Sequence, residues 1–83
     1  MSNIRVRLKL SGELLPSLCG FDEKTLELPE GSTVGDAVAT AIIDEKLRGL
    51  CTTILNGLEV DPDSALRDRD FVLLTMFAVV SGG

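Results

Sequence analysis

Few side chains in this sequence could support catalysis, and their types exclude most enzyme mechanisms. The chain contains no histidine and only two cysteines, Cys19 and Cys51. Without an imidazole there is no Ser–His or Cys–His nucleophile pair and no histidine-based metal site. Two cysteines are also too few for the four thiolates that hold an iron–sulfur cluster. We therefore expect no bound metal, no bound cofactor and no catalytic residues of the chain's own.

The remaining polar motifs have structural interpretations. The aspartate pairs Asp61/Asp63 and Asp68/Asp70 lie in segments rich in turn-forming residues, so we interpret them as turn formers and solvated charges. The stretch "GSTVGDA" has two glycines but lacks the lysine of a phosphate-binding P-loop. The two cysteines have no CxxC spacing, which favours small, buried side chains in a reducing compartment.

The segment with the clearest chemical potential is Ser81–Gly82–Gly83, which follows an apolar run. Glycine has no Cβ, so two glycines make a thin leader that fits a narrow catalytic channel in another protein. The carboxylate of Gly83 would be the reacting group, and the folded body would position it by binding the partner elsewhere. A frayed end and a remnant of cloning are the alternative interpretations of the diglycine.

Length and composition fit one small globular domain. The chain has 83 residues, of which 45% are hydrophobic and 25% charged. Its formal net charge of −5 disfavours nucleic-acid binding and favours a partner with a basic docking surface. No segment has the apolar core of a signal peptide or the ~20 apolar residues of a membrane span. We expect a cytoplasmic protein that binds neither nucleic acid nor membrane.

Hydrophobic periodicity predicts the first half of the fold. Residues 4–10 alternate apolar and basic side chains, as in a strand with one wet face, and residues 24–29 resume the alternation. The intervening residues 11–21 contain two glycines and a proline and are predicted to be a connection. Thr33 and Asp36 predict a capping box at the start of a single helix of about fifteen residues.

The pattern of the second half of the sequence predicts further strands, which complete a small sheet. The dipeptide Asn56–Gly57 favours a type I′ hairpin turn between residues 50–55 and a brief return strand. Residues 71–77 are apolar on both faces, which is typical of a central strand. One main helix on one face of a mixed sheet of four to five strands is an α+β domain in the β-grasp (ubiquitin-like) arrangement. We expect this domain to span residues 1–77, with residues 78–83 as a flexible tail.

The last predicted strand also offers a candidate docking surface. Side chains alternate along a strand, so if its even-numbered residues face the helix, Phe71, Leu73 and Phe77 line the opposite face. Apolar residues gathered on an open sheet face favour a partner site. In the alternative interpretation, the connection at residues 11–21 folds over these side chains.

Three motifs resemble, in order, those of the ubiquitin-like sulfur carriers: "ILNGLEV" the asparagine-turn hairpin, "LRDRD" the acidic turn before the last strand, and "VVSGG" the diglycine tail. The stretch "TLELPEGSTVGDAV" also resembles the family's second strand and helix start. The family comprises the small subunit of molybdopterin synthase and the sulfur carrier of the thiamine pathway. Arg69 stands where the family usually has a glycine between the paired acids, so we expect a different turn geometry there.

The resemblance implies a protein substrate rather than a catalyst. In such carriers an ATP-dependent activating enzyme, an adenylyltransferase, adenylates the terminal glycine carboxylate, here Gly83. A sulfur donor protein then converts the acyl-adenylate to a thiocarboxylate, which passes its sulfur on within a synthase large subunit or a thiazole synthase. Ser81, Gly82 and Gly83 would enter the partner's active site, and ATP would be used by the partner alone. The "SGG" ending slightly favours the molybdopterin branch over the thiamine branch.

Two other functions remain open on the sequence. A ubiquitin-like protein modifier would be joined through Gly83 to lysines of target proteins, and isopeptide conjugates would reveal it. A non-covalent β-grasp binding module would carry the diglycine by accident. That module would keep its function after deletion of Gly83.

Overall fold

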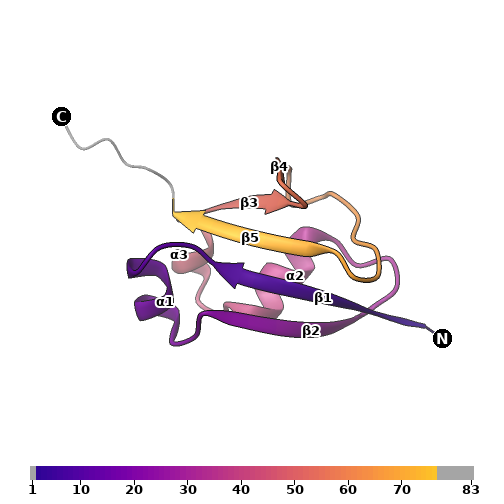
Figure 1. Cartoon of the computed structure of the whole chain (residues 1–83), viewed down its shortest axis with the longest axis horizontal. Helices are drawn as coiled ribbons and strands as arrows, with labels where there is room; N and C mark the ends of the chain where they lie inside the picture. Colours follow the sequence, from indigo (N-terminus) through magenta and orange to yellow (C-terminus); the bar gives the residue numbers. More distant parts are fainter. Residues whose placement is uncertain (1, 77–83) are drawn as a thin grey trace.

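The computed structural model describes residues 2–76, and these form a mixed sheet with helices packed on one face (Figure 1). The strands are β1 (Asn3–Leu10), β2 (Glu23–Pro29), β3 (Cys51–Leu55), β4 (Leu58–Glu59) and β5 (Phe71–Met76), and the helices are α1 (Leu14–Cys19), α2 (Val34–Ala41) and α3 (Glu45–Arg48). The strand order is β2-β1-β5-β3-β4, with β1 and β5 parallel and the other neighbouring pairs antiparallel. The predicted β-grasp fold is confirmed.

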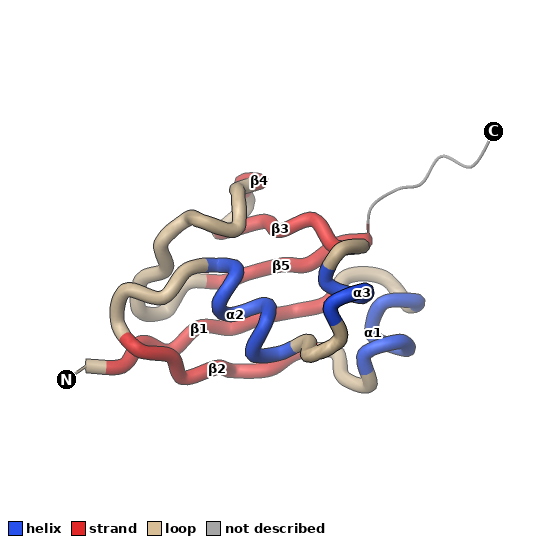
Figure 2. Tube along the Cα trace, turned by 180° about the vertical axis from the view of Figure 1, so that it is seen from behind, coloured by secondary structure: helices blue, strands red, loops and turns tan. Residues whose placement is uncertain are grey.

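The core lies between the sheet and α2, which crosses one face of it (Figure 2). The apolar side chains of β1 point into this layer, and Val6 and Leu8 have no exposed surface. Val72 and Leu74 on β5 are buried to the same extent. Full burial of one such side chain stabilises the fold by roughly 1.5–3 kcal/mol.

The predicted single helix is divided into two. The capping box at Thr33 and Asp36 forms as expected, but Ile42 is extended and ends α2. The side chain of Asp44 accepts the backbone N–H of Lys46 at 2.9 Å and starts α3. Arg48 Nη1 donates to the carbonyl oxygens of both Ile42 (2.8 Å) and the following residue (2.7 Å). These bonds satisfy carbonyl groups that the interruption leaves without helical partners.

The predicted connection at residues 11–21 contains a short helix, α1. Leu15 is fully buried and anchors α1 to the core. Pro16 lies in the first turn, where its missing N–H costs nothing, and Gly20 ends the helix with a φ of +84° and an N–H bond to the Pro16 carbonyl of 2.8 Å. Within residues 2–76, no helix has the length and apolar character to span a bilayer.

Candidate docking face and carboxyl-terminal segment

The predicted reactive segment lies outside the described residues, as do Phe77 and the predicted boundary at residue 77. The structure does describe the strand that leads to it. β5 lies between β1 and β3, so the chain reaches residue 77 from the middle of the sheet. Met76, the last described residue, is paired with Cys51 at the start of β3.

Alternate residues of β5 belong to different faces, as the sequence predicts. Val72 and Leu74 are buried under the helices, whereas Phe71 and Leu73 are half-buried on the other side of the sheet. α1 does not cover these two residues. Its Leu15 belongs to the helix-side core, and its Leu18 lines a hollow together with residues of α2 and α3. The arrangement in which residues 11–21 fold over the face is therefore not observed.

We call the uncovered side of the sheet the open face. Strand pairing places Arg7 and Lys9 of β1 beside Phe71 and Leu73 of β5, and it places Ile54 of β3 opposite Leu73. The open face therefore has three central strips: Arg5, Arg7 and Lys9 on β1; Phe71, Leu73 and Thr75 on β5; Thr52 and Ile54 on β3. The outer strands add Glu23, Thr25 and Glu27 on β2 and Glu59 on β4.

Phe71 is partly covered by a cation from the neighbouring strand. The guanidinium carbon of Arg7 lies 5.5 Å from the centre of the Phe71 ring, a cation–π geometry. Arg7 is held there by Glu23 on β2, whose Oε2 accepts bonds from Nε (2.8 Å) and Nη2 (2.6 Å). The strip on β5 is thus continuous with a charged strip on β1.

Asn56 fixes the start of β5 as well as the hairpin turn. Its φ of +50° and the φ of +92° at Gly57 confirm the predicted turn type. Its side-chain oxygen accepts the Phe71 N–H at 2.9 Å, and its Nδ2 donates to Asp70 Oδ1 at 2.9 Å. We predicted only the turn, because the side-chain partners lie 14 and 15 positions away in the sequence.

The expectation of a different geometry at Arg69 is wrong, because this residue adopts a φ of +71°, the conformation that glycine favours. The Arg69 N–H donates to the Arg5 carbonyl at 2.7 Å, and Asp68 Oδ1 accepts the Arg5 N–H at 2.8 Å. Asp70 Oδ2 accepts the Arg67 N–H at 2.8 Å. The pair forms a turn, as predicted; Asp70 closes it on Arg67, and Asp68 also bonds it to β1.

The two cysteines lie at the helix side of the sheet and are half-buried. Burial raises the pKa of the Cys51 thiol, with a smaller contribution from the charge of Cys19. Burial also raises the pKa of Cys19, and Asp44 adds to it. Both thiols stay protonated at neutral pH and are poor nucleophiles, in agreement with a structural role. Within residues 2–76, no cluster of three or more His, Cys, Asp or Glu side chains could hold a metal ion.

No protein-family model and no curated protein matches this chain. Solved structures do. A putative molybdopterin converting factor, subunit 1, from Pyrococcus furiosus is 27% identical over 88% of this chain and 97% of its own, with a TM-score of 0.74. Small archaeal modifier protein 1 from Methanosarcina acetivorans is 22% identical over all of both chains, with a TM-score of 0.71. A complex of subunits 1 and 2 of molybdopterin-converting factor from Helicobacter pylori contains a chain that is 20% identical over 96% of this chain and 100% of its own, with a TM-score of 0.64.

The fold and these neighbours define a ubiquitin-like β-grasp protein. The likeness to the Pyrococcus protein extends along nearly the whole of both chains, in sequence as well as in structure. It confirms the resemblance to the ubiquitin-like sulfur carriers.

Proposed function

We propose that this chain is a sulfur carrier in cofactor biosynthesis and that it serves enzymes as a protein substrate. The observation that carries the proposal is the 27% identity to a putative molybdopterin converting factor, subunit 1, over 88% of this chain. The diglycine of Gly82 and Gly83 supports it, since both residues follow the strand that leaves the middle of the sheet.

The chemistry begins with a carboxylate that is too poor an acyl donor to react unaided. The Gly83 carboxylate attacks the α-phosphorus of ATP within the activating enzyme and releases pyrophosphate. The outer sulfur of a persulfide on the donor protein then attacks the acyl carbon and displaces AMP. A second thiol cleaves the resulting acyl disulfide, which leaves a thiocarboxylate on Gly83 and a disulfide between the two thiols. Ser81 would be the last side chain before the catalytic channel, because the glycines after it have none to obstruct entry. The Pyrococcus neighbour favours molybdopterin over thiamine as the pathway.

The open face is the proposed docking surface for the activating enzyme and for the large subunit of the synthase. Phe71 and Leu73 are half-buried there, and Phe77 would continue the same row. The Helicobacter pylori protein of the same fold was solved in complex with subunit 2, which supports a partner of this kind. Binding on the open face holds the body still while the terminal glycines reach the reacting groups.

Intact mass spectrometry of the protein purified from its native cells tests the proposal. We expect a fraction of the molecules to carry sulfur in place of one oxygen, and fragmentation should locate the exchange on Gly83. A variant that lacks Gly83, expressed in the same cells, is the matched control and should show no exchange.

Two results would contradict this function. Isopeptide conjugates under reducing conditions, in the absence of any thiocarboxylate, would assign the chain to the protein modifiers. Full function of the variant without Gly83 would assign it to the non-covalent binding modules.

A further inference from the structure

The bases of β1 form a row along the open face. Arg5, Arg7 and Lys9 are all exposed, and Arg7 and Lys9 lie in register with Phe71 and Leu73. The same spacing keeps them on one side of the sheet, because side chains of a strand alternate. A protein that covers the apolar strip of β5 must therefore also come close to these cations.

These cations differ in how firmly they are already paired. Arg7 is engaged by Glu23 and by the Phe71 ring. Arg5 has only a loose ion pair, 4.0 Å between its Nη2 and Glu27 Oε2, and both side chains are mostly exposed. Lys9 is in none of the ion pairs within 4.0 Å that residues 2–76 form. An exposed pair of this kind contributes little, so Arg5 can exchange it for a carboxylate of another protein, and Lys9 can bind one directly.

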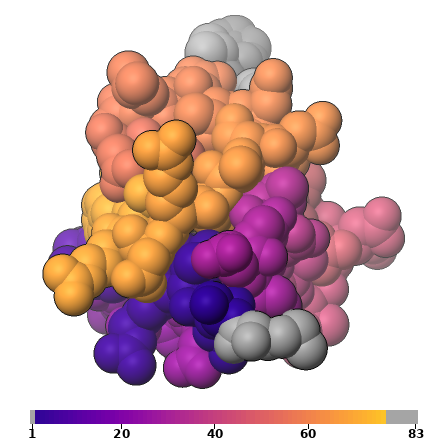
Figure 3. Space-filling model, turned by 90° about the vertical axis from the view of Figure 1, so that its right-hand side faces the viewer, coloured from indigo at the N-terminus to yellow at the C-terminus, as the bar shows by residue number. Residues whose placement is uncertain are grey.

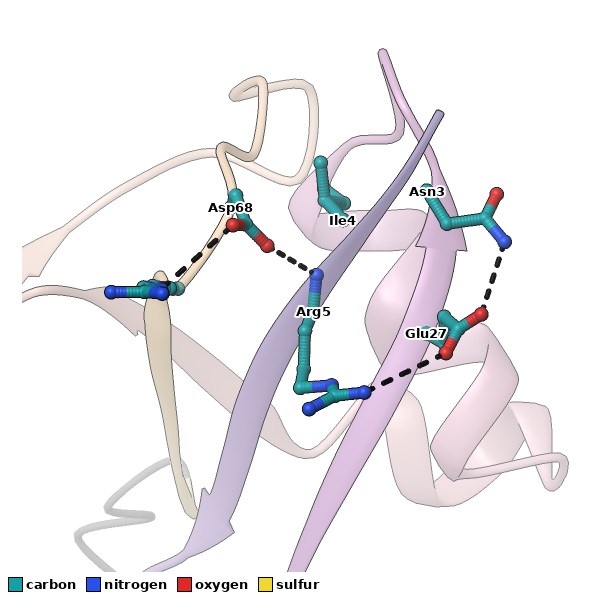
Figure 4. A pocket seen from close by; sticks show the side chains of 6 residues that line it. Asn3, Ile4, Arg5, Glu27 and Asp68 are labelled. Carbon is teal, nitrogen blue, oxygen red and sulfur yellow. Dashed lines mark hydrogen bonds and ion pairs between the residues drawn. The ribbon is translucent and has the colours of Figure 1, made fainter. Parts of the chain in front are cut away.

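A second guanidinium lies close to the start of this row. A hollow of about 300 Å³ is lined by Arg5, Glu27, Asp68 and Arg69, and Figure 4 shows Arg5 between Asp68 and Glu27. The Arg69 side chain is 91% exposed, and its Nε lies 3.9 Å from Asp68 Oδ2. The end-on view of Figure 3 shows the first residues of β1 (indigo) beside the segment that precedes β5 (orange).

The charge of the open face therefore differs from that of the whole chain. The net charge of −5 led us to expect a basic docking surface on the partner. Several of the acids that create this charge lie elsewhere. Asp36 and Asp44 cap helices on the other side of the sheet, and Asp61 and Asp63 lie in the loop after β4. On the open face itself, Glu23 and Glu27 of β2 lie beside the bases of β1, and Glu59 of β4 lies beyond β3. The row of bases on β1 is therefore the basic part of this face.

We propose that the surface of the activating enzyme that covers the open face is apolar at its centre and carries acidic side chains opposite β1. Those carboxylates would pair with Lys9 along the strand and with Arg5 and Arg69 at the hollow. Such complementary charges at the rim of an interface accelerate association and fix its register. The inference rests on the proposed function, because that function requires an activating enzyme to dock here.

The test uses the activating enzyme of the same organism, identified by its ATP-dependent adenylation of the wild-type chain. Its Kd and association rate are measured for the wild type, Lys9→Glu and Arg69→Glu at low and high NaCl concentration. We expect each substitution to weaken binding about tenfold at low salt, chiefly through a slower association rate. The loss should shrink as salt screens the charges.

Lys46→Glu is the matched control, since it makes the same charge change at an exposed residue of α3 on the helix side. It should alter Kd less than about twofold, as expected for a charge remote from the interface. Equal or tighter binding by Lys9→Glu and Arg69→Glu, with thermal unfolding unchanged, would overturn the acidic partner surface and leave the carrier function standing. Failure of any enzyme to adenylate the wild type would remove the proposed function and this inference together.

Discussion

Val72 and Leu74 are fully buried beneath the helices, whereas Phe71 and Leu73 on the same strand stay half-buried on the open face. The buried pair is surrounded by aliphatic side chains of β1 and α2. The half-buried pair lies beside basic side chains of β1. Adjacent residues of one strand can thus be assigned to different tasks, with stability on the helix side and recognition on the open side. Substitutions on the two sides should separate the two properties.

The largest effect is expected from Leu74→Ala. Removing a fully buried leucine side chain leaves a cavity, and we expect the free energy of unfolding to fall by about 2–5 kcal/mol, measured by urea denaturation. Leu73→Ala, its neighbour on the open face, should cost less than about half as much because the side chain is already partly in water. Equal losses for the two variants would contradict the division between the faces.

A smaller but functional effect is expected from Leu73→Asp. It places a charge in the apolar strip of the open face, and binding to the activating enzyme should weaken by about tenfold or more, measured by calorimetry. Leu58→Asp is the control, because Leu58 is 72% exposed on β4 and its strand partner is Leu55, outside the strips of the open face. Unchanged affinity for a folded Leu73→Asp variant would remove the docking surface.

Asn56→Gly separates the turn from its side chain. Glycine accepts the positive φ at no steric cost, so the hairpin should form. The bonds to the Phe71 N–H and Asp70 Oδ1 are lost, however. We expect about 1–2 kcal/mol of destabilisation, which urea denaturation would detect. A variant as stable as the wild type would show that these two bonds do not hold the start of β5.

Arg69→Gly should stabilise the protein, in contrast to Asn56→Gly. A left-handed conformation costs a non-glycine residue roughly 1 kcal/mol, and glycine removes that strain while it adds entropy to the unfolded chain. We expect a net stabilisation of about 0.5 kcal/mol, which would be seen as a small rise in the midpoint of urea unfolding. A clear loss of stability would mean that the Arg69 side chain holds the turn.

The sequence predicts features whose determinants are neighbours in the chain. The alternation of β1, the capping box at Thr33 and Asp36 and the Asn56–Gly57 turn all depend on residues within a few positions of one another. The same holds for β5, because its side chains alternate between the two faces. Once a helix is known to cover one side of the sheet, the sequence predicts which residues of β5 are buried.

Features that depend on distant residues could not be predicted. The division between α2 and α3 is held by Arg48, which reaches back to two carbonyl groups. The left-handed Arg69 is held by its backbone bond to Arg5 of β1 and by the bond of the neighbouring Asp68 side chain to the same residue, more than sixty positions away in the chain. Which of the bases of β1 remain available also follows only from the pairing of β1 with β2.

The position of β5 has a mechanical consequence. Residues 71–74 pair in parallel with β1, and residues 72–76 pair in antiparallel with β3. A partner that pulls on the chain beyond Met76 loads both rows of hydrogen bonds in shear, so that they resist together instead of opening one after another. Both ladders of hydrogen bonds share tension that is applied beyond Met76, and this opposes the peeling of β5 away from the sheet.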